Sequence, residues 1–300
     1  MHTVPDHLKG LLITALGVII LSPDALLVRL VDSDIWTTIV WRGVLTFLAL
    51  AAGLAVVHRG RLLTAFRSTG RWGLLVSLFF AVNTTLFVYS VTHTAAANTL
   101  VIIAGGPLFG AVLSRIFLRE HVAAETWVAT LLVVGGIGVL VGDGLQQGTW
   151  TGDLAGIVVA LSLSANFVVM RHRKDISMVP ATALGALTSG VVVLAVMLAS
   201  GSGPPTVAAP RDWLWIAAMG LVVVPGAFGF ITIGPRYITA PEVGLLMLLE
   251  TVLGPLWVWL ALGELPTATA AAAGVFVVVT LVAYFTVRLR RQARARRAAA

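Results

Sequence analysis

Long apolar runs separated by short polar gaps repeat along the whole chain. Ten of these runs are about 20 residues long, the length that an α-helix needs to cross the hydrocarbon core of a bilayer. They lack the strict alternation of a membrane β-barrel, and a segment that faces lipid must satisfy its own backbone hydrogen bonds, so helices are predicted. The predicted spans are residues 10–31, 35–57, 72–92, 95–117, 124–142, 153–171, 178–199, 213–233, 239–262 and 267–288.

The composition is that of a membrane protein. Hydrophobic residues make up 58% of the chain and charged residues only 11%, whereas a soluble domain carries about 25% charged residues. With so few polar side chains to cover a surface in water, the surplus apolar surface must face lipid. The first run contains Pro23, Asp24 and Arg29, and another apolar run follows within a few residues, so we expect a retained helix, not a cleaved signal peptide.

Lys and Arg residues alternate between the gaps. They follow the second, fourth, sixth and eighth runs, and the intervening gaps carry none except Arg211. By the positive-inside rule, this predicts a multi-pass protein of the cell (inner) membrane with both termini in the cytoplasm. The net charge of +7 therefore reflects membrane topology, and we expect no nucleic-acid partner.

The two halves of the chain resemble each other. The segment Ala96–Glu120 aligns with Ala240–Glu264, and each is an apolar helix that ends in glutamate before a short polar gap. Because five helices are an odd number, the second copy must be inverted in the membrane, which is a transporter architecture. The predicted fold is an all-α integral membrane protein in which two inverted five-helix repeats, residues 1–144 and 145–288, surround a central cavity. A basic cytoplasmic tail is expected at residues 289–300.

Two stretches resemble a known family. They are Gly106-Pro107-Leu108-Phe109 with the following Phe117-Leu118-Arg119-Glu120, and the segment GLLMLLETVLGPLWVWLALGELP at residues 244–266. With the ten spans and the repeat, the chain resembles the drug/metabolite transporter superfamily, EamA type. The resemblance implies a cavity lined by helices 1, 3, 4, 6, 8 and 9, and export of amino acids or other small metabolites. The usual proline of the second copy is replaced by Thr251.

Glu250 is the main candidate for substrate contact, because a charged group inside a bilayer is costly and usually faces a cavity or a partner. Met247, Glu250, Gly254 and Trp257 share one face of a continuous helix, which would present a carboxyl, an apolar surface and an indole to an amphipathic ligand. The alternative is a buried glutamate that only packs the bundle. Coupling to protons and uncoupled transport both stay open.

Prolines and charges mark further positions inside the spans. Asp24 follows Pro23 at an expected helix break, where it either caps the break or pairs with Arg42. Arg42 is expected to be an outer-leaflet anchor or a member of that ion pair. Pro107 and Pro225 are candidate kinks or hinges, together with Pro23.

Polar and aromatic positions on the third and sixth spans complete the predicted cavity. Phe79, Asn83 and Phe87 form a stripe with an amide in its middle, and Ser162 and Asn166 lie one turn apart. Phenylalanine stripes also serve packing, and Ser and Asn also make hydrogen bonds between helices, worth about 0.6 kcal/mol each. We nevertheless place Phe79, Asn83, Ser162 and Asn166 in the substrate cavity, because the polar positions fall near mid-depth on helices that the family resemblance places around the cavity.

Other function classes fit less well. An intramembrane enzyme needs a nucleophile with a base, paired carboxylates or a metal cluster, and none of these motifs occurs, so no catalytic residue, metal or cofactor is expected. A lipid or lipid-linked metabolite translocase needs a basic headgroup site, and a channel is disfavoured by an inverted repeat. The sequence predicts a secondary transporter that exports small amphipathic metabolites, above all amino acids, by alternating access. Its partners would be that small molecule, the lipid bilayer and, if transport is coupled, protons.

Overall fold

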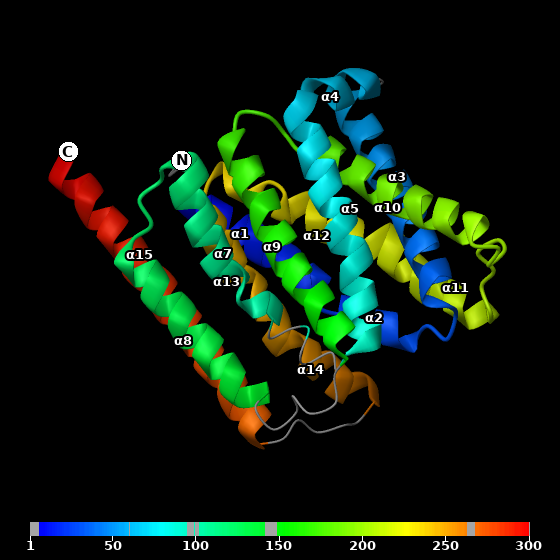
Figure 1. The fold of residues 1–300 in the computed structure, drawn as a ribbon. Helices are drawn as coiled ribbons and strands as arrows, with labels where there is room; N and C mark the ends of the chain where they lie inside the picture. The colour runs from blue at the N-terminus through cyan, green and yellow to red at the C-terminus, as the bar shows by residue number, and fades with distance from the viewer. Residues whose placement is uncertain are drawn as a thin grey trace.

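A computed structural model describes residues 6–59, 61–94, 99, 102–141, 149–262 and 268–299. Every regular element in these ranges is a helix (Figure 1). Six helical segments are long and apolar enough to cross a membrane: Asp6–Leu30, Ile35–His58, Gly70–His93, Trp150–His172, Val179–Ala199 and Pro210–Arg236. Shorter apolar helices cover Ile102–Leu118 and Ala124–Gly135. The protein is therefore a multi-pass membrane protein, as predicted.

The helices follow one another with short connections. In the first half they are α1 (Asp6–Leu21), α2 (Asp24–Leu30), α3 (Ile35–His58), α4 (Leu62–Ser68), α5 (Gly70–His93), α7 (Gly106–Leu113), the π-helix η1 (Ser114–Leu118) and α8 (Ala124–Val141). In the second half they are α9 (Trp150–His172), α10 (Val179–Ala199), α11 (Pro210–Ala217), the π-helix η3 (Ala218–Val223), α12 (Val224–Ile231), the 3₁₀ turn η4 (Gly234–Arg236), α13 (Ala240–Met247), α14 (Leu249–Leu262) and α15 (Ala268–Ala299).

Three differences from the sequence prediction stand out. The gap after the second span, expected to be a loop, contains the short helix α4. The span predicted at 239–262 is divided at Leu248, because α13 ends at Met247 and α14 begins at Leu249. The helix α15 continues to Ala299, through the segment expected to be a tail. Ala96, Glu264 and the predicted repeat boundary at 144 and 145 lie outside the described residues.

The three candidate kink prolines each lie at the start of a helical segment. Pro23 occupies the N-cap of α2, and Pro107 and Pro225 lie in the first turns of α7 and α12. Proline has no backbone N–H, so it is tolerated where a helix begins and where that donor would have no partner. Each proline therefore marks a point at which a helical segment begins or changes its helix type.

The contacts between helices repeat when the two halves are exchanged. The helix α5 packs against α9 and α10, and its counterparts α12 and η3 pack against α1 and α3. In the same way α7 packs against α9, and α13 packs against α1. The pairs α3–α10, α7–α13 and α8–α15 are their own counterparts. In Figure 1, α8 and α15 lie together along one edge of the bundle. The packing is therefore that of a two-repeat protein.

A glycine contact brings α3 and α10 together almost backbone to backbone. A Cβ atom added to Gly43 of α3 would lie only 2.5 Å from the carbonyl oxygen of Ala186 and 3.0 Å from the amide nitrogen of Gly190, both in α10. Close approach at small residues is typical of helix pairs in membranes, where burial of apolar area gives little advantage over lipid. Gly43 directly follows Arg42, so this crossing also fixes the position of the arginine.

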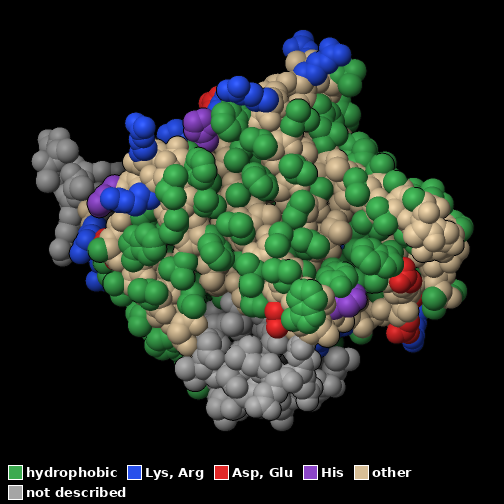
Figure 2. All heavy atoms as spheres, in the orientation of Figure 1, with side chains coloured by type: hydrophobic (Ala, Val, Ile, Leu, Met, Phe, Trp, Pro, Cys, Tyr) green, Lys and Arg blue, Asp and Glu red, His purple; other side chains and the backbone are tan. Residues whose placement is uncertain are grey.

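The surface separates an apolar belt from a basic side. Figure 2 shows hydrophobic side chains over most of the face in view, with Lys and Arg gathered along the edge near α4 and the labelled chain ends. We call this edge the basic side. Arg211, the exception to the charge alternation, forms an ion pair with Asp32. Large apolar side chains exposed on the belt include Leu48, Val56, Leu74, Val222 and Leu260.

Candidate functional site

A cavity lies where the divided helices meet in the middle of the bundle. It offers about 40 Å³ to the centre of a water-sized sphere, and one water needs roughly 10–15 Å³ of such space, so only a few waters fit. The polar lining residues are Asp24, Arg42, Asn83, Thr84 and Glu250. The apolar wall is formed by Leu21, Phe87, Ile103, Val159, Leu163, Phe228, Met247 and Leu248. In this conformation the cavity is too narrow for a metabolite.

An ion pair forms one side of this cavity. The Nη2 atom of Arg42 donates to Oδ2 of Asp24 at 2.6 Å, and Nη1 donates to the hydroxyl of Thr84 at 2.8 Å. Asp24 lies in the first turn of α2, Arg42 is on α3 and Thr84 is on α5, so the pair joins three helices. Of the two alternatives that the sequence left for Arg42, the ion pair is confirmed.

The pair is incompletely satisfied. Oδ1 of Asp24 and Nε of Arg42 are both buried and have no hydrogen-bond partner in the part of the chain that the structure describes. The Asp24 residue is 1% exposed and the Arg42 residue 5% exposed, and buried polar groups of this kind are normally hydrogen-bonded. Two residues that line the cavity thus each keep one buried polar atom, an acceptor and a donor, without a partner.

Glu250 adds a second carboxyl to the same space. It lies in the first turn of α14, directly after the break at Leu248, where the positive end of the helix dipole favours an acidic group. The residue is 8% exposed and lines the cavity. Within the described ranges its carboxyl has no hydrogen-bond partner. The cavity therefore holds two acidic groups and one basic group between apolar walls.

Four of the residues predicted for the substrate cavity line it together: Asp24, Asn83, Met247 and Glu250. They come from α2, α5, α13 and α14, so residues far apart in the sequence meet at one depth. The amide of Asn83 donates to the carbonyl of Val159 on α9 at 3.5 Å. Sequence reasoning did not place Thr84 in the cavity, although it follows Asn83 directly.

The indole of Trp257 lies elsewhere. Its Nε1 donates to the hydroxyl of Ser22 at 2.7 Å, and the residue is 38% exposed. The sequence placed it beside Met247 and Glu250 by assuming one continuous helix. Trp257 lies about two turns beyond Glu250 along α14, and there its indole connects α14 to the division between α1 and α2.

Ser162 and Asn166 are buried in α9 and do not line the cavity. The hydroxyl of Ser162 donates to the carbonyl of Val159 in its own helix at 3.1 Å. Asn166 follows the cavity residues Val159 and Leu163 at helical spacing, toward the basic side. Its amide oxygen and nitrogen are both buried without a partner among the described residues.

Phe79 belongs to a second, larger cavity. This cavity offers about 280 Å³ to the centre of a water-sized sphere and lies between α5, η1 with the end of α7, and α9. Its other lining residues are Trp72, Leu75, Leu113, Phe117, Leu118, Ala165, Val168, Val169 and His172. Phe117 is 70% exposed, so the lining includes a ring on the apolar surface.

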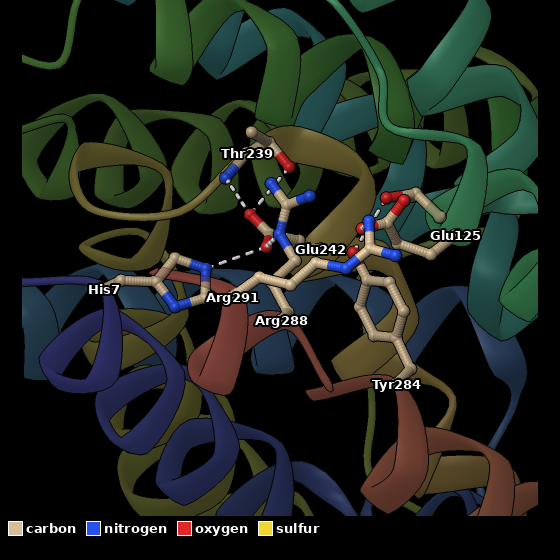
Figure 3. Close-up of polar contacts among 8 residues, drawn as sticks. His7, Glu125, Thr239, Glu242, Tyr284, Arg288 and Arg291 are labelled. Atoms are coloured by element: carbon tan, nitrogen blue, oxygen red, sulfur yellow. Dashed lines mark hydrogen bonds and ion pairs between the residues drawn. The ribbon is translucent and has the colours of Figure 1, made fainter. Parts of the chain in front are cut away.

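A buried glutamate that the sequence analysis did not single out joins three helices on the basic side (Figure 3). Oε1 of Glu242 lies 2.8 Å from Nε2 of His7 on α1 and accepts from Nε of Arg288 on α15 at 2.6 Å. Oε2 accepts from the amide nitrogen and the hydroxyl of Thr239, each at 2.8 Å. The spacing Thr-x-x-Glu before an apolar run is a capping-box signal and could have identified this residue.

Two further contacts join α15 to α8 close to Glu242. The hydroxyls of Tyr284 and Thr126 lie 2.8 Å apart, and Nη1 of Arg291 donates to Glu125 at 2.7 Å (Figure 3). We call His7, Thr239, Glu242 and Arg288, with these two outer contacts, the Glu242 network. It connects the basic-side ends of α1, α8, α13 and α15.

Comparison with known proteins agrees with this architecture. The EamA-like transporter family matches the chain twice, over residues 8–142 and 150–286. The chain belongs to the EamA-like transporter family. The family resemblance noted in the sequence is thereby confirmed.

Two individual proteins are similar to this EamA-like transporter. The uncharacterized transporter YdfC of Bacillus subtilis (strain 168) is 27% identical over 193 residues, which cover 61% of this chain and 60% of YdfC. The chain thus matches about 60% of that relative's length. A solved crystal structure with a TM-score of 0.75 and 18% identity covers 95% of this chain and 99% of its own. At that identity the likeness concerns the fold alone.

Proposed function

We propose that the protein is a secondary transporter that exports small amphipathic metabolites, above all amino acids, by alternating access. The observation that carries the proposal is the Glu250 carboxyl, which has no partner among the described residues and lines a cavity with apolar walls. An ammonium group is the natural complement of such a carboxyl, because a charge inside the membrane needs a partner. The apolar walls suit the carbon skeleton of the same ligand.

The arrangement of the helices supports alternating access. The cavity lies where segments of both halves meet. Three of the segments around it are divided next to it, at Pro23, Gly105 and Leu248, as in transporters with broken helices. At about 40 Å³ the cavity must widen before a metabolite can enter. We infer ten crossings: the six long spans and the segments 102–118, 124–141, 240–262 and 268–288. The basic side then faces the cytoplasm, with both termini.

Transport assays in proteoliposomes test this function. A panel of labelled amino acids is offered to vesicles that contain the native protein, Glu250→Gln, Asn83→Ala or Glu125→Gln. Glu125 is a control because it is an acidic residue of the basic side, away from the cavity. We expect uptake of at least one amino acid above empty vesicles, a drop of at least tenfold in Glu250→Gln, a smaller loss in Asn83→Ala and no change in Glu125→Gln.

Two outcomes contradict the proposal separately. If no amino acid enters faster with the native protein than with empty vesicles, the substrate class is rejected. If Glu250→Gln and Asn83→Ala transport as fast as the native protein, the cavity is not the substrate site, whatever the substrate is.

Lipid translocation is the second candidate, and the larger cavity favours it. An apolar hollow of about 280 Å³ with an exposed ring at its rim suits an acyl chain. A translocase also needs charged groups for the lipid headgroup. Among the described residues that line this cavity, only His172 has a titratable side chain. Movement of a fluorescent phospholipid between leaflets of the same proteoliposomes, without any amino-acid uptake, would favour this alternative.

A further inference from the structure

The under-satisfied ion pair in the central cavity calls for an explanation beyond packing. A guanidinium offers five N–H donors, and two of them are used here, on Asp24 and Thr84. Nε of Arg42 and Oδ1 of Asp24 are buried without a partner in the described part of the chain. A pair that serves only to hold helices together has no reason to leave a donor and an acceptor unused, because each unmet buried group is costly.

The position of the pair indicates what would use these groups. Asp24 and Arg42 both line the cavity beside Glu250, while the two unpartnered atoms, Oδ1 of Asp24 and Nε of Arg42, have almost no accessible surface in this conformation. A ligand in the cavity would therefore meet a guanidinium and a free carboxyl at once. Planar guanidinium groups bind carboxylates through paired N–H donors, which an ammonium group cannot do with the same geometry.

The charges select a class of ligand. A simple amine would occupy Glu250 and leave Arg42 unchanged, whereas an anion would find one basic group against two acidic ones. A zwitterion provides an ammonium for Glu250 and a carboxylate for Arg42, so both sites are used. Among the described residues, the rest of the lining, which includes Leu163, Phe228 and Met247, has no charged group to receive a charged side chain.

We propose that Arg42, positioned by Asp24, binds the carboxylate of the substrate, and that the cavity thereby selects zwitterionic amino acids with apolar side chains over the corresponding amines. The inference rests on the proposed function and adds the group that recognises the carboxylate. Asp24 acts through Arg42: it holds the guanidinium at the cavity wall while the cavity is empty.

Ligand binding to the native protein in lipid nanodiscs tests the proposal without any mutation. Labelled L-phenylalanine, phenethylamine and L-phenylalaninamide are compared by equilibrium dialysis, at a pH at which all three amino groups are protonated. The three share the ring and the ammonium, and only the first has a carboxylate. We expect L-phenylalanine to bind at least tenfold more tightly than the other two. Equal binding of all three would overturn the role of Arg42.

A charge-neutral double variant provides the second arm. Asp24→Asn with Arg42→Gln removes both charges of the pair and keeps the net charge, and thermal unfolding verifies that the variant is folded. We expect its affinity for L-phenylalanine to fall at least tenfold and its affinity for phenethylamine to change less than twofold. An equal loss for both ligands, or no loss for either, would overturn the proposal while the native protein still binds amino acids. If the native protein binds none of the three while the transport panel shows amino-acid uptake, this selectivity alone is refuted, whereas no uptake in the panel would refute the proposed function as well.

Discussion

The glycine contact between α3 and α10 gives a prediction whose size follows from the structure. We consider Gly43→Ala, with Gly53→Ala in the same helix as its control. The new Cβ at Gly43 would lie 2.5 Å from a backbone oxygen of α10, whereas nothing lies within 4 Å of a Cβ at Gly53. A Cβ atom essentially never lies within 3.0 Å of a heavy atom from another helix, so the two helices must separate by roughly 0.5 Å, which a close-packed interior resists.

Two opposing effects set the magnitude. Alanine is a better helix former than glycine by about 1 kcal/mol, and this gain applies to both variants. Overpacking costs about 1–3 kcal/mol and applies only to Gly43→Ala. The difference between the two variants cancels the propensity effect. We therefore expect Gly43→Ala to have a free energy of unfolding about 1–3 kcal/mol lower than that of Gly53→Ala.

The measurement is reversible unfolding by SDS titration in mixed micelles, followed by circular dichroism, with both variants in one lipid–detergent mixture. Because Arg42 precedes Gly43, the same variant should also bind L-phenylalanine more weakly, while Gly53→Ala should bind it as the native protein does. If the two variants unfold at the same SDS fraction, the close approach at Gly43 does not constrain the fold and our reasoning fails.

Two further predictions concern contacts away from the cavity. Glu242→Gln should lower the free energy of unfolding by about 3 kcal/mol or more, because removing the charge of a buried partner leaves Arg288 uncompensated, whereas Glu125→Gln at the exposed edge should cost less than about 1 kcal/mol; equal effects in the same SDS titration would contradict this. Ser22→Ala and Trp257→Phe both remove the hydrogen bond between these two side chains, and Ser22→Ala also removes the bond from Ser22 to the carbonyl of Ile19. Trp257→Phe should therefore cost about 1 kcal/mol and Ser22→Ala at least as much. The double variant should cost less than the sum of the two, because the single variants share one bond. Additive losses would show that the two residues act independently.

The sequence predicted the helices well because lipid imposes a simple rule on composition. Spans of sufficient apolar length appear as helices, and the division of the first span lies at Pro23, where proline removes a backbone donor. The break at Leu248 has no such local signal, since the family's usual proline is Thr251 here. Its position depends on how α13 and α14 pack against other helices, which a single sequence does not contain.

The candidate site was predictable only in part, for the same reason. Residues that are costly in lipid, such as Asp24 and Glu250, stand out by chemistry alone. Trp257 lies about two turns from Glu250 along α14, and its indole reaches Ser22 on a neighbouring segment, a contact between helices that the sequence does not show. The sequence leaves two alternatives for Arg42, because its position near the outer end of the second span suits a surface anchor as well as a buried ion pair. Its hydrogen bonds to Asp24 on α2 and Thr84 on α5 identify the buried pair, and these contacts between helices are absent from the sequence.

The Glu242 network holds one end of the segment formed by α13 and α14 more firmly than the other. On the basic side, Glu242 links α13 to α1 through His7 and to α15 through Arg288. At its other end α13, which is about 12 Å long, ends at the break at Leu248 beside Glu250. If the cavity widens toward the basic side, either the bonds of Glu242 to His7 and Arg288 break, or α1, α13 and α15 move together as a rigid unit. On the opposite side, tilting of α14 about Leu248 must break the hydrogen bond from Trp257 to Ser22 but leaves the Glu242 network intact. The two directions of opening therefore face different energy barriers.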